Sequence, residues 1–488
     1  MSASRFYTHL PAVAAVLWLL GASTLGAQTP GAPATPSGSQ STPTLDALAA
    51  EIRRLQLAIQ ALESQLDDSR QQTAAVQQAL QALRDSLTEE RDLLTAQVST
   101  LEQAKVESGS KYRVRVFGMA LMQLVSARGT VDNIDLPSLA IEAVPGDSGG
   151  NISAAVRQSY LGVAVFGPPL GGAKTSADFT MDFFGGFPAA NDGLSAASVR
   201  LRTLSMAAEG KRYSIRAGQE AVFFSPLSPT SLASTAYPAL SQSGNVWAWT
   251  PQVSVERRIE RPGSTEVSLR GGVLDSLTGE LPAGEYSRLA TAGERSRLPA
   301  FAGRVGWRRT REDRVFSAGA GVYYARQNWK YERNVHAAAF TADWDWPLSD
   351  RVLVSGEFYR GRAIGGLGGG ANSSVLFEGP ATDPGSIVHP LRSTGGWTQV
   401  KLKTTPRLEF NGVFGLDRSR PRPTTATLEP PTDESPFAPS NSSAFINTIY
   451  QARSNIFFSV EYRRLWSTRI DGRAWLADHV TVSGGVAF

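Results

Sequence analysis

The chain has 488 residues, of which 42% are hydrophobic, and its mean hydropathy is -0.17. No run of about 20 apolar residues follows the extreme N-terminus, which excludes a membrane protein built from helices. The chain has no cysteine, so disulfide bonds, thiolate metal sites and a cysteine nucleophile are excluded as well. Residues 1–110 hold 7 basic and 11 acidic residues, and subtraction from the totals of 48 and 44 leaves 41 basic and 33 acidic residues in 111–488.

The N-terminal segment has the pattern of a secretory signal peptide. Arg5 supplies a positive charge, Ala12 to Leu20 is a short apolar run, and small residues precede a cleavage site near Ala27. This predicts a signal peptide over 1–27, with an uncleaved anchor as the alternative. Residues 28–44 are rich in Pro, Gly, Ser and Thr, and we expect a disordered leader there.

A heptad repeat follows and predicts a coiled coil over 45–107. With Leu45 as position a, 13 of the 17 a and d positions through Leu101 are apolar, and neither Pro nor Gly interrupts them. Such a narrow seam is typical of helices that associate with copies of themselves, although the mixed Leu and Ile residues do not fix the oligomer number. An amphipathic helix that folds onto another part of the chain is the alternative. The predicted core residues are Leu45, Leu48, Ile52, Leu55, Ile59, Leu62, Leu66, Leu80, Leu83 and Leu87.

Residues 111–488 change to a period of two, which predicts an all-β transmembrane barrel of about 16 antiparallel strands. In 173–184, for example, apolar or small residues alternate with polar ones, as a strand between lipid and a wet lumen requires. The candidate strands are 112–125, 155–167, 173–184, 197–208, 212–220, 247–258, 264–274, 299–310, 314–326, 335–347, 351–362, 396–404, 407–417, 444–452, 455–466 and 474–488. Counts of 14 or 18 strands remain open.

The connections alternate in length along the chain. Those after even-numbered strands are short, whereas those after odd-numbered strands are mostly long, for example 126–154, 221–246 and 363–395. Bacterial outer-membrane barrels have short periplasmic turns and long outer loops. We therefore expect the outer membrane of a Gram-negative bacterium as the location, with the coiled coil in the periplasm. The last strand ends at the aromatic Phe488, which resembles the signal that the barrel assembly machinery recognises.

Three short motifs resemble those of the DcaP-like trimeric outer-membrane porins. They are Asp182-Phe183-Phe184-Gly185-Gly186, Arg200-Leu201-Arg202 and Ala217-Gly218-Gln219. The chain departs from the family pattern directly after two of them, with Thr203-Leu204-Ser205 and Glu220-Ala221-Val222. The resemblance implies a homotrimer and passive uptake of small anionic solutes such as dicarboxylates.

The candidate functional residues are those of a pore constriction. Seven arginines at polar strand positions are expected to line the pore and to select anions: Arg200, Arg202, Arg212, Arg216, Arg270, Arg304 and Arg308. The alternative is that they pair with lumen acids such as Glu256, Glu266 and Glu409 and only stiffen the wall. The segment from Glu220 to Val246 is poor in charge, so we expect it to fold into the lumen or to pack at a trimer interface. Its candidate constriction residues are Glu220, Pro226, Pro229, Pro238 and Asn245.

No catalytic or metal-binding pattern is present among the four histidines, and we expect neither an enzyme, a cofactor nor a nucleic-acid partner. The sequence predicts a porin for small hydrophilic solutes that prefers anions. Lipopolysaccharide is a further expected partner, because arginines in loops would bind its phosphates. The alternative function is an outer-membrane anchor whose coiled coil acts as a periplasmic spacer, and a trimeric adhesin is a third, weaker option.

Overall fold

A computed structural model describes residues 45–106, 112–187, 197–280, 288–420, 428–429, 439–469 and 471–488. The predicted signal peptide and leader lie outside the described residues, as does the junction 107–111. The chain divides into two compact units, Met1–Glu90 and Arg91–Phe488, which are described separately.

The described residues 45–106 form one long helix, most of which belongs to the N-terminal unit. Helix α1 (Leu45–Val106) has 62 residues, which corresponds to about 93 Å at 1.5 Å per residue. The seam residues whose side chains the structure describes are solvent-exposed in the single chain: Ile52 is 50% exposed, Leu62 64% and Leu80 58%. The side chains of the predicted core residues Leu45, Leu48 and Leu87 lie outside the described part. Apolar stripes of this kind are stable in water only when another surface covers them. The helix is confirmed, whereas the coiled coil stays a prediction. Among the described residues, no helix has both the length and the apolar character to cross a membrane.

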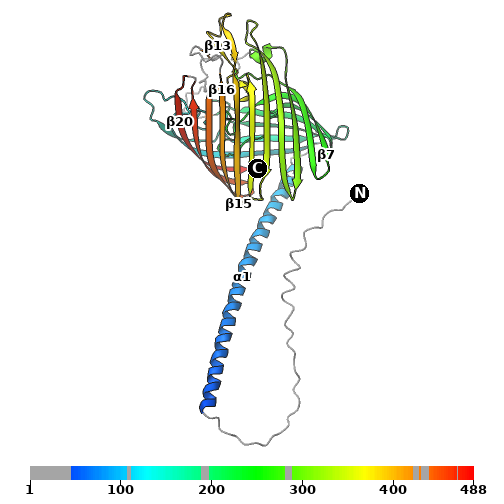
Figure 1. The fold of residues 1–488 in the computed structure, drawn as a ribbon. Helices are drawn as coiled ribbons and strands as arrows, with labels where there is room; N and C mark the ends of the chain where they lie inside the picture. The colour runs from blue at the N-terminus through cyan, green and yellow to red at the C-terminus, as the bar shows by residue number, and fades with distance from the viewer. Residues whose placement is uncertain are drawn as a thin grey trace. The chain divides into compact units, whose positions relative to one another are not determined.

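The C-terminal unit is a closed antiparallel β-barrel (Figure 1). Its sheet has 17 strand segments, but β2 and β3 both pair with β1 and occupy one position in the wall, which leaves sixteen positions. Pairing of β1 with β20 closes the ring. The segments are β1 (Arg113–Arg128), β2 (Gly150–Ala155), β3 (Tyr160–Phe166), β4 (Lys174–Asp182), β5 (Arg200–Glu209), β6 (Tyr213–Ala221), β7 (Trp249–Arg261), β8 (Thr265–Leu274), β9 (Ala300–Arg311), β10 (Arg314–Asn328), β11 (Asn334–Pro347), β12 (Val352–Arg362), β15 (Arg392–Thr405), β16 (Leu408–Arg420), β18 (Ser440–Arg453), β19 (Ile456–Thr468) and β20 (Ala474–Ala487).

The sixteen predicted strands are confirmed, with one correction. The second strand, predicted as 155–167, is interrupted at 156–159, and part of the predicted loop 126–154 belongs to strand β2. The interruption frees Arg157 and Gln158 from the ladder, and both side chains are buried, at 9% and 0% exposure. They contact loops inside the barrel, as described below.

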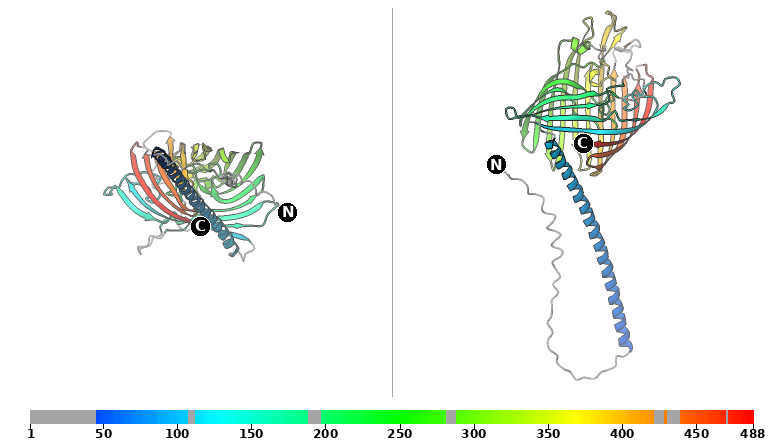
Figure 2. Two further views of the ribbon diagram at one scale, coloured as in Figure 1. Left: turned by 90° about the horizontal axis from the view of Figure 1, so that it is seen from below. Right: turned by 180° about the vertical axis from the view of Figure 1, so that it is seen from behind.

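The wall has an apolar outer face and a polar inner face. On β19, Phe458 and Val460 point outward and are 52% and 53% exposed, whereas Ser459, Glu461 and Arg463 point inward and are buried. This alternation is typical of a barrel in lipid. Two further views show the wall from below and from behind (Figure 2).

The barrel has a short-turn end and a long-loop end. Connections such as 210–212, 312–313 and 454–455 join strands at the short-turn end, where β1 begins and β20 ends. The long loops carry α2 (Ala292–Arg295), the 3-10 helix η1 (Gly365–Leu367) and a small sheet of β13 (Val375–Glu378), β14 (Ile387–Pro390) and β17 (Leu428–Glu429). At the C-terminus, the backbone of Phe488 exchanges two hydrogen bonds with Gly118 of β1, at 3.0 and 3.1 Å.

Candidate functional site

The connection between β6 and β7 folds into the barrel. This inserted loop (residues 222–248) begins with Val222, Phe223 and Phe224, which are at most 4% exposed. Phe224 stacks on Tyr323 of β10 at a centroid distance of 5.4 Å. An apolar segment with few charges gains more from burial than from exposure to water, so the loop packs against the inner wall.

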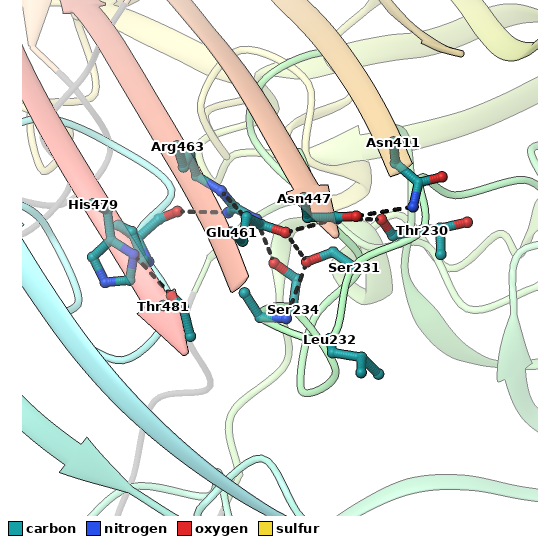
Figure 3. Close-up of polar contacts among 12 residues, drawn as sticks. Thr230, Ser231, Leu232, Ser234, Asn411, Asn447, Glu461, Arg463, His479 and Thr481 are labelled. Carbon is teal, nitrogen blue, oxygen red and sulfur yellow. Dashed lines mark hydrogen bonds and ion pairs between the residues drawn. The ribbon is translucent and has the colours of Figure 1, made fainter. Parts of the chain in front are cut away.

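The tip of the inserted loop is hydrogen-bonded to the wall opposite the strands that carry the loop (Figure 3). Gln399 of β15 accepts from the backbone N–H of Thr230 at 2.7 Å, and Asn447 of β18 donates to the Thr230 carbonyl at 2.9 Å. The hydroxyl of Ser231 donates to Glu461 of β19. Strands β18 and β19 lie about half-way around the ring from β6 and β7, so the loop crosses the lumen.

A buried ion pair holds the tip from the wall side. Arg463 and Glu461 form a pair at 2.7 Å, and their side chains are 4% and 2% exposed. Arg463 also donates to the hydroxyl of Ser234 at 2.7 Å, while Asn447 donates to Glu461 at 3.1 Å. A buried ion pair is favourable only when further hydrogen bonds satisfy both charges, and the loop provides two of them, through Ser231 and Ser234.

The return path of the inserted loop is fixed by Gln158, between β2 and β3, and by Arg200 of β5. Gln158 accepts from the backbone N–H of Thr235 at 2.8 Å and donates to the carbonyl of Ala233 at 3.1 Å. Arg200 of β5 donates to the carbonyl of Ala236 at 2.9 Å. The loop is thus held at both sides of the barrel.

Two other long loops also fold inward. In the first long loop, Asp135 forms a buried pair with Arg157, and the carbonyl of Ile134 lies 2.8 Å from Nε2 of His479. In the loop 363–391, the backbone N–H of Gly370 donates to Asp417 of β16 at 2.9 Å. Inward side chains of β15 to β20 are therefore mostly buried under loops.

The charged inward side chains of β5 to β9 remain partly exposed and include most of the predicted arginines, whereas Ser205, Gln252 and Ser254 on the same strands are buried. Arg200 and Arg202 share one carboxylate, that of Asp182, at 2.6 and 3.7 Å. Both guanidinium groups also lie over the ring of Trp249, at 5.3 and 4.8 Å from its centroid. Two positive charges thus face one negative charge beside an aromatic surface.

A second cluster of charged residues lies on the same wall, nearer the short-turn end. Glu220 contacts Arg216 at 3.2 Å and Arg270 at 3.6 Å, and Arg216 also pairs with Glu209. Arg270 is the direct cross-strand neighbour of Arg304, which in turn pairs with Asp343 of β11 at 2.6 Å. The side chains of Arg216, Arg270 and Arg304 are 38%, 21% and 17% exposed.

Several predicted site residues need correction. Arg212 lies in the turn before β6 and not on a strand, and Glu220 belongs to β6 rather than to the loop. Arg308 has the inward parity of β9, beside Glu266 of β8. The predicted acid partners are only partly those observed: Glu256 lies 3.8 Å from Arg258, and Glu409 pairs with Lys401 at 3.4 Å.

The other predicted loop residues lie in the inserted loop. Pro226, Pro229 and Pro238 interrupt it, and Asn245 is buried and donates to the carbonyl of Ala239 at 2.9 Å. Asn245 therefore closes the loop upon itself.

Sequence reasoning missed the residues that hold the inserted loop. They are amides and acids at inward positions of strands far from the loop: Gln123, Glu357, Gln399, Asn447 and Glu461. The available signal was the accumulation of Asn, Gln and Ser at polar positions of β15 to β20, where a water-filled wall would carry more charge.

Comparison with known proteins supports the fold. No family model and no curated protein matches the sequence. Among solved structures, the outer membrane channel DcaP of Acinetobacter baumannii is similar, with a TM-score of 0.56 and 16% identity over 78% of this chain and 99% of that chain. An anion-selective porin from Comamonas acidovorans has a TM-score of 0.47 and 10% identity, over 78% of this chain and 100% of that chain. The barrel thus has the fold of the DcaP channel.

Proposed function

We propose that the chain is an outer-membrane porin that lets small hydrophilic solutes diffuse across the membrane, with a preference for small anions. The observation that carries this proposal is the unequal inner wall. Loops cover most inward side chains of β15 to β20, with Lys401 and Glu409 at 15% and 20% exposure. Charged side chains of β5 to β9 keep 14 to 44% of their surface exposed in the ion pairs around Arg202, Arg216 and Arg270. An aqueous path along β5 to β9 follows, with the inserted loop as its other boundary.

The anion preference rests on the level of Asp182, where two arginines face one carboxylate, whereas arginines and carboxylates are equal in number at the level of Glu220. Arg200 and Arg202 share Asp182, and Arg216 and Arg270 share Glu220, although Arg216 has Glu209 as a second partner. The carboxylates partly compensate the arginine charges, so we expect only a modest preference for anions, because paired opposite charges produce a weak electric field at a distance. A guanidinium group beside an aromatic ring also suits carboxylate ligands.

Reversal potentials in planar bilayers test the anion preference. The double variant Arg202→Ala plus Arg216→Ala should shift the reversal potential in the direction of cation selectivity. The reason is that Asp182 and Glu220 then each lose one of their two arginine partners. The matched control is Arg257→Ala plus Arg309→Ala, which removes two arginines from the outward parity of β7 and β9. Cation selectivity of the wild-type protein, or equal shifts in both variants, would contradict the preference.

We further propose that α1 forms a periplasmic coiled coil in a homotrimer. Its exposed heptad seam supports self-association. The short-turn end is the end where β1 begins, and it would be periplasmic if the long loops are external. Assembly through Phe488 by the barrel assembly machinery belongs to the same proposal.

A structural tether is the second candidate, and the length of α1 favours it. A helix of 62 residues is longer than a trimerisation element needs. Deletion of residues 45–106 should leave conductance intact if transport is the function, and should detach the membrane from the cell wall if tethering is.

A further inference from the structure

The outer face of the barrel carries five arginines at the long-loop end. They are Arg360 and Arg362 of β12, Arg392 of β15, and Arg418 and Arg420 of β16. All five have the outward parity of their strands and are exposed. Within the part of the chain that the structure describes, none of them forms an ion pair.

The strand register arranges these arginines in two rows. Arg362, Arg392 and Arg420 are direct cross-strand neighbours, and Arg360 and Arg418 occupy the next row on either side of Thr394. Adjacent strands are only about 4.8 Å apart, and like charges directly opposite each other are destabilising. An anion that binds between them would remove this repulsion.

An apolar groove continues from the arginine rows toward the middle of the wall. Its volume is about 990 Å³, and the five arginines form part of its lining. Below them it is lined by Phe358, Phe414 and Leu416, with Gly396 in between. Phe358 and Phe414 are 40% and 47% exposed. The surface is therefore amphipathic, with cations at the membrane boundary and apolar side chains beneath.

We propose that this groove is a binding site for the phosphorylated, multiply acylated glycolipid of the outer leaflet, that is, for the lipid A part of lipopolysaccharide. The arginine rows would bind its phosphates through charge-assisted hydrogen bonds, and the apolar part would hold an acyl chain. The proposal rests on the proposed outer-membrane location, which places the long-loop end at the outer leaflet.

The position of the groove favours a lipid over a second copy of the chain. Strands β12, β15 and β16, which carry the groove, have 11, 14 and 13 residues. Strands β3, β4 and β6 have only 7, 9 and 9 residues, at or below the roughly 9–11 residues that cross a bilayer. The short-strand wall is thus better suited to contact with protein, and the long-strand wall to contact with lipid.

The test measures lipid binding to the full-length protein by native mass spectrometry. Diphosphoryl lipid A is added to the wild type and to a variant with Arg362→Gln, Arg392→Gln and Arg420→Gln. The matched control carries Arg257→Gln, Arg309→Gln and Arg311→Gln, which remove three arginines at outward positions near the short-turn end. A second variant, Arg360→Gln plus Arg418→Gln, tests the other row.

We expect the triple variant to bind lipid A about tenfold or more weakly, the second variant to be weakened as well, and the control to bind as the wild type does. Equal binding in the triple variant and the wild type would overturn the proposal. Equal binding of phosphatidylglycerol would also overturn it, because the site would then not distinguish lipid A. Bilayer conductance separates the lipid-site proposal from the porin proposal. A triple variant that conducts normally but still binds lipid A contradicts only the lipid site. A wild-type protein that binds lipid A but never conducts contradicts only the porin.

Discussion

At the scale of single residues, the charge of the barrel interior depends on which arginines form ion pairs with carboxylates. The alternation of polar residues was sufficient to predict that Arg202, Arg216, Arg270 and Arg304 point inward. Their partners could not be predicted, because Asp182, Glu209 and Asp343 reach them through strand register and side-chain conformation. Period-two patterns give the face of a residue but not its neighbour across the sheet.

The buried Glu461 gives a prediction at this scale. Glu461→Ala leaves Arg463 without its ion-pair partner and removes the acceptor of Ser231. Breaking one side of a buried pair costs about 3–5 kcal/mol, so we expect lower stability to denaturant and, since the loop tip is released, larger and noisier channel currents.

Ser459→Ala is the control for this variant. Ser459 is inward and buried on the same strand, and its hydroxyl has no hydrogen-bond partner in the described residues. Currents of Glu461→Ala that match those of Ser459→Ala would mean that the inserted loop does not limit the pore.

At the scale of elements, the strands were predictable and the long loops were not. Hydrophobic alternation and turn residues predict strands from local sequence, and the sixteen strand positions follow from them. The segment of the inserted loop was predicted to fold into the lumen or to pack at a trimer interface. Its course could not be predicted, because it depends on contacts with Gln399 and Glu461 more than 160 residues away. The glycine-rich segment 365–370 is mostly buried and includes η1.

Helix α1 gives a prediction at the scale of elements. Leu62→Asp plus Leu66→Asp places carboxylates in the heptad seam, and we expect loss of the oligomer by size-exclusion chromatography with light scattering, because charged residues at core positions oppose association. Leu57 is 67% exposed and lies outside the seam, so Leu57→Asp is the matched control. Equal oligomer size in all three proteins would contradict the coiled coil.

At the scale of the whole molecule, the architecture follows from one physical requirement. In lipid every backbone polar group needs a partner, and a closed barrel provides one without any free edge. Pairing of β1 with β20 meets that requirement here, and the outward apolar residues complete a surface suited to lipid. The barrel was predicted from the period of two and the alternating lengths of the connections, whereas the choice of solute depends on side chains whose arrangement the sequence does not determine.

The central claim is that the barrel is an open channel, and single-channel conductance of the purified protein in a planar bilayer tests it most directly. We predict stable openings in steps of three with anion selectivity, because three barrels would conduct independently in one trimer. A folded protein that inserts into the bilayer and stays silent would contradict the claim, since the inserted loop would then close the lumen and the tethering function would be favoured.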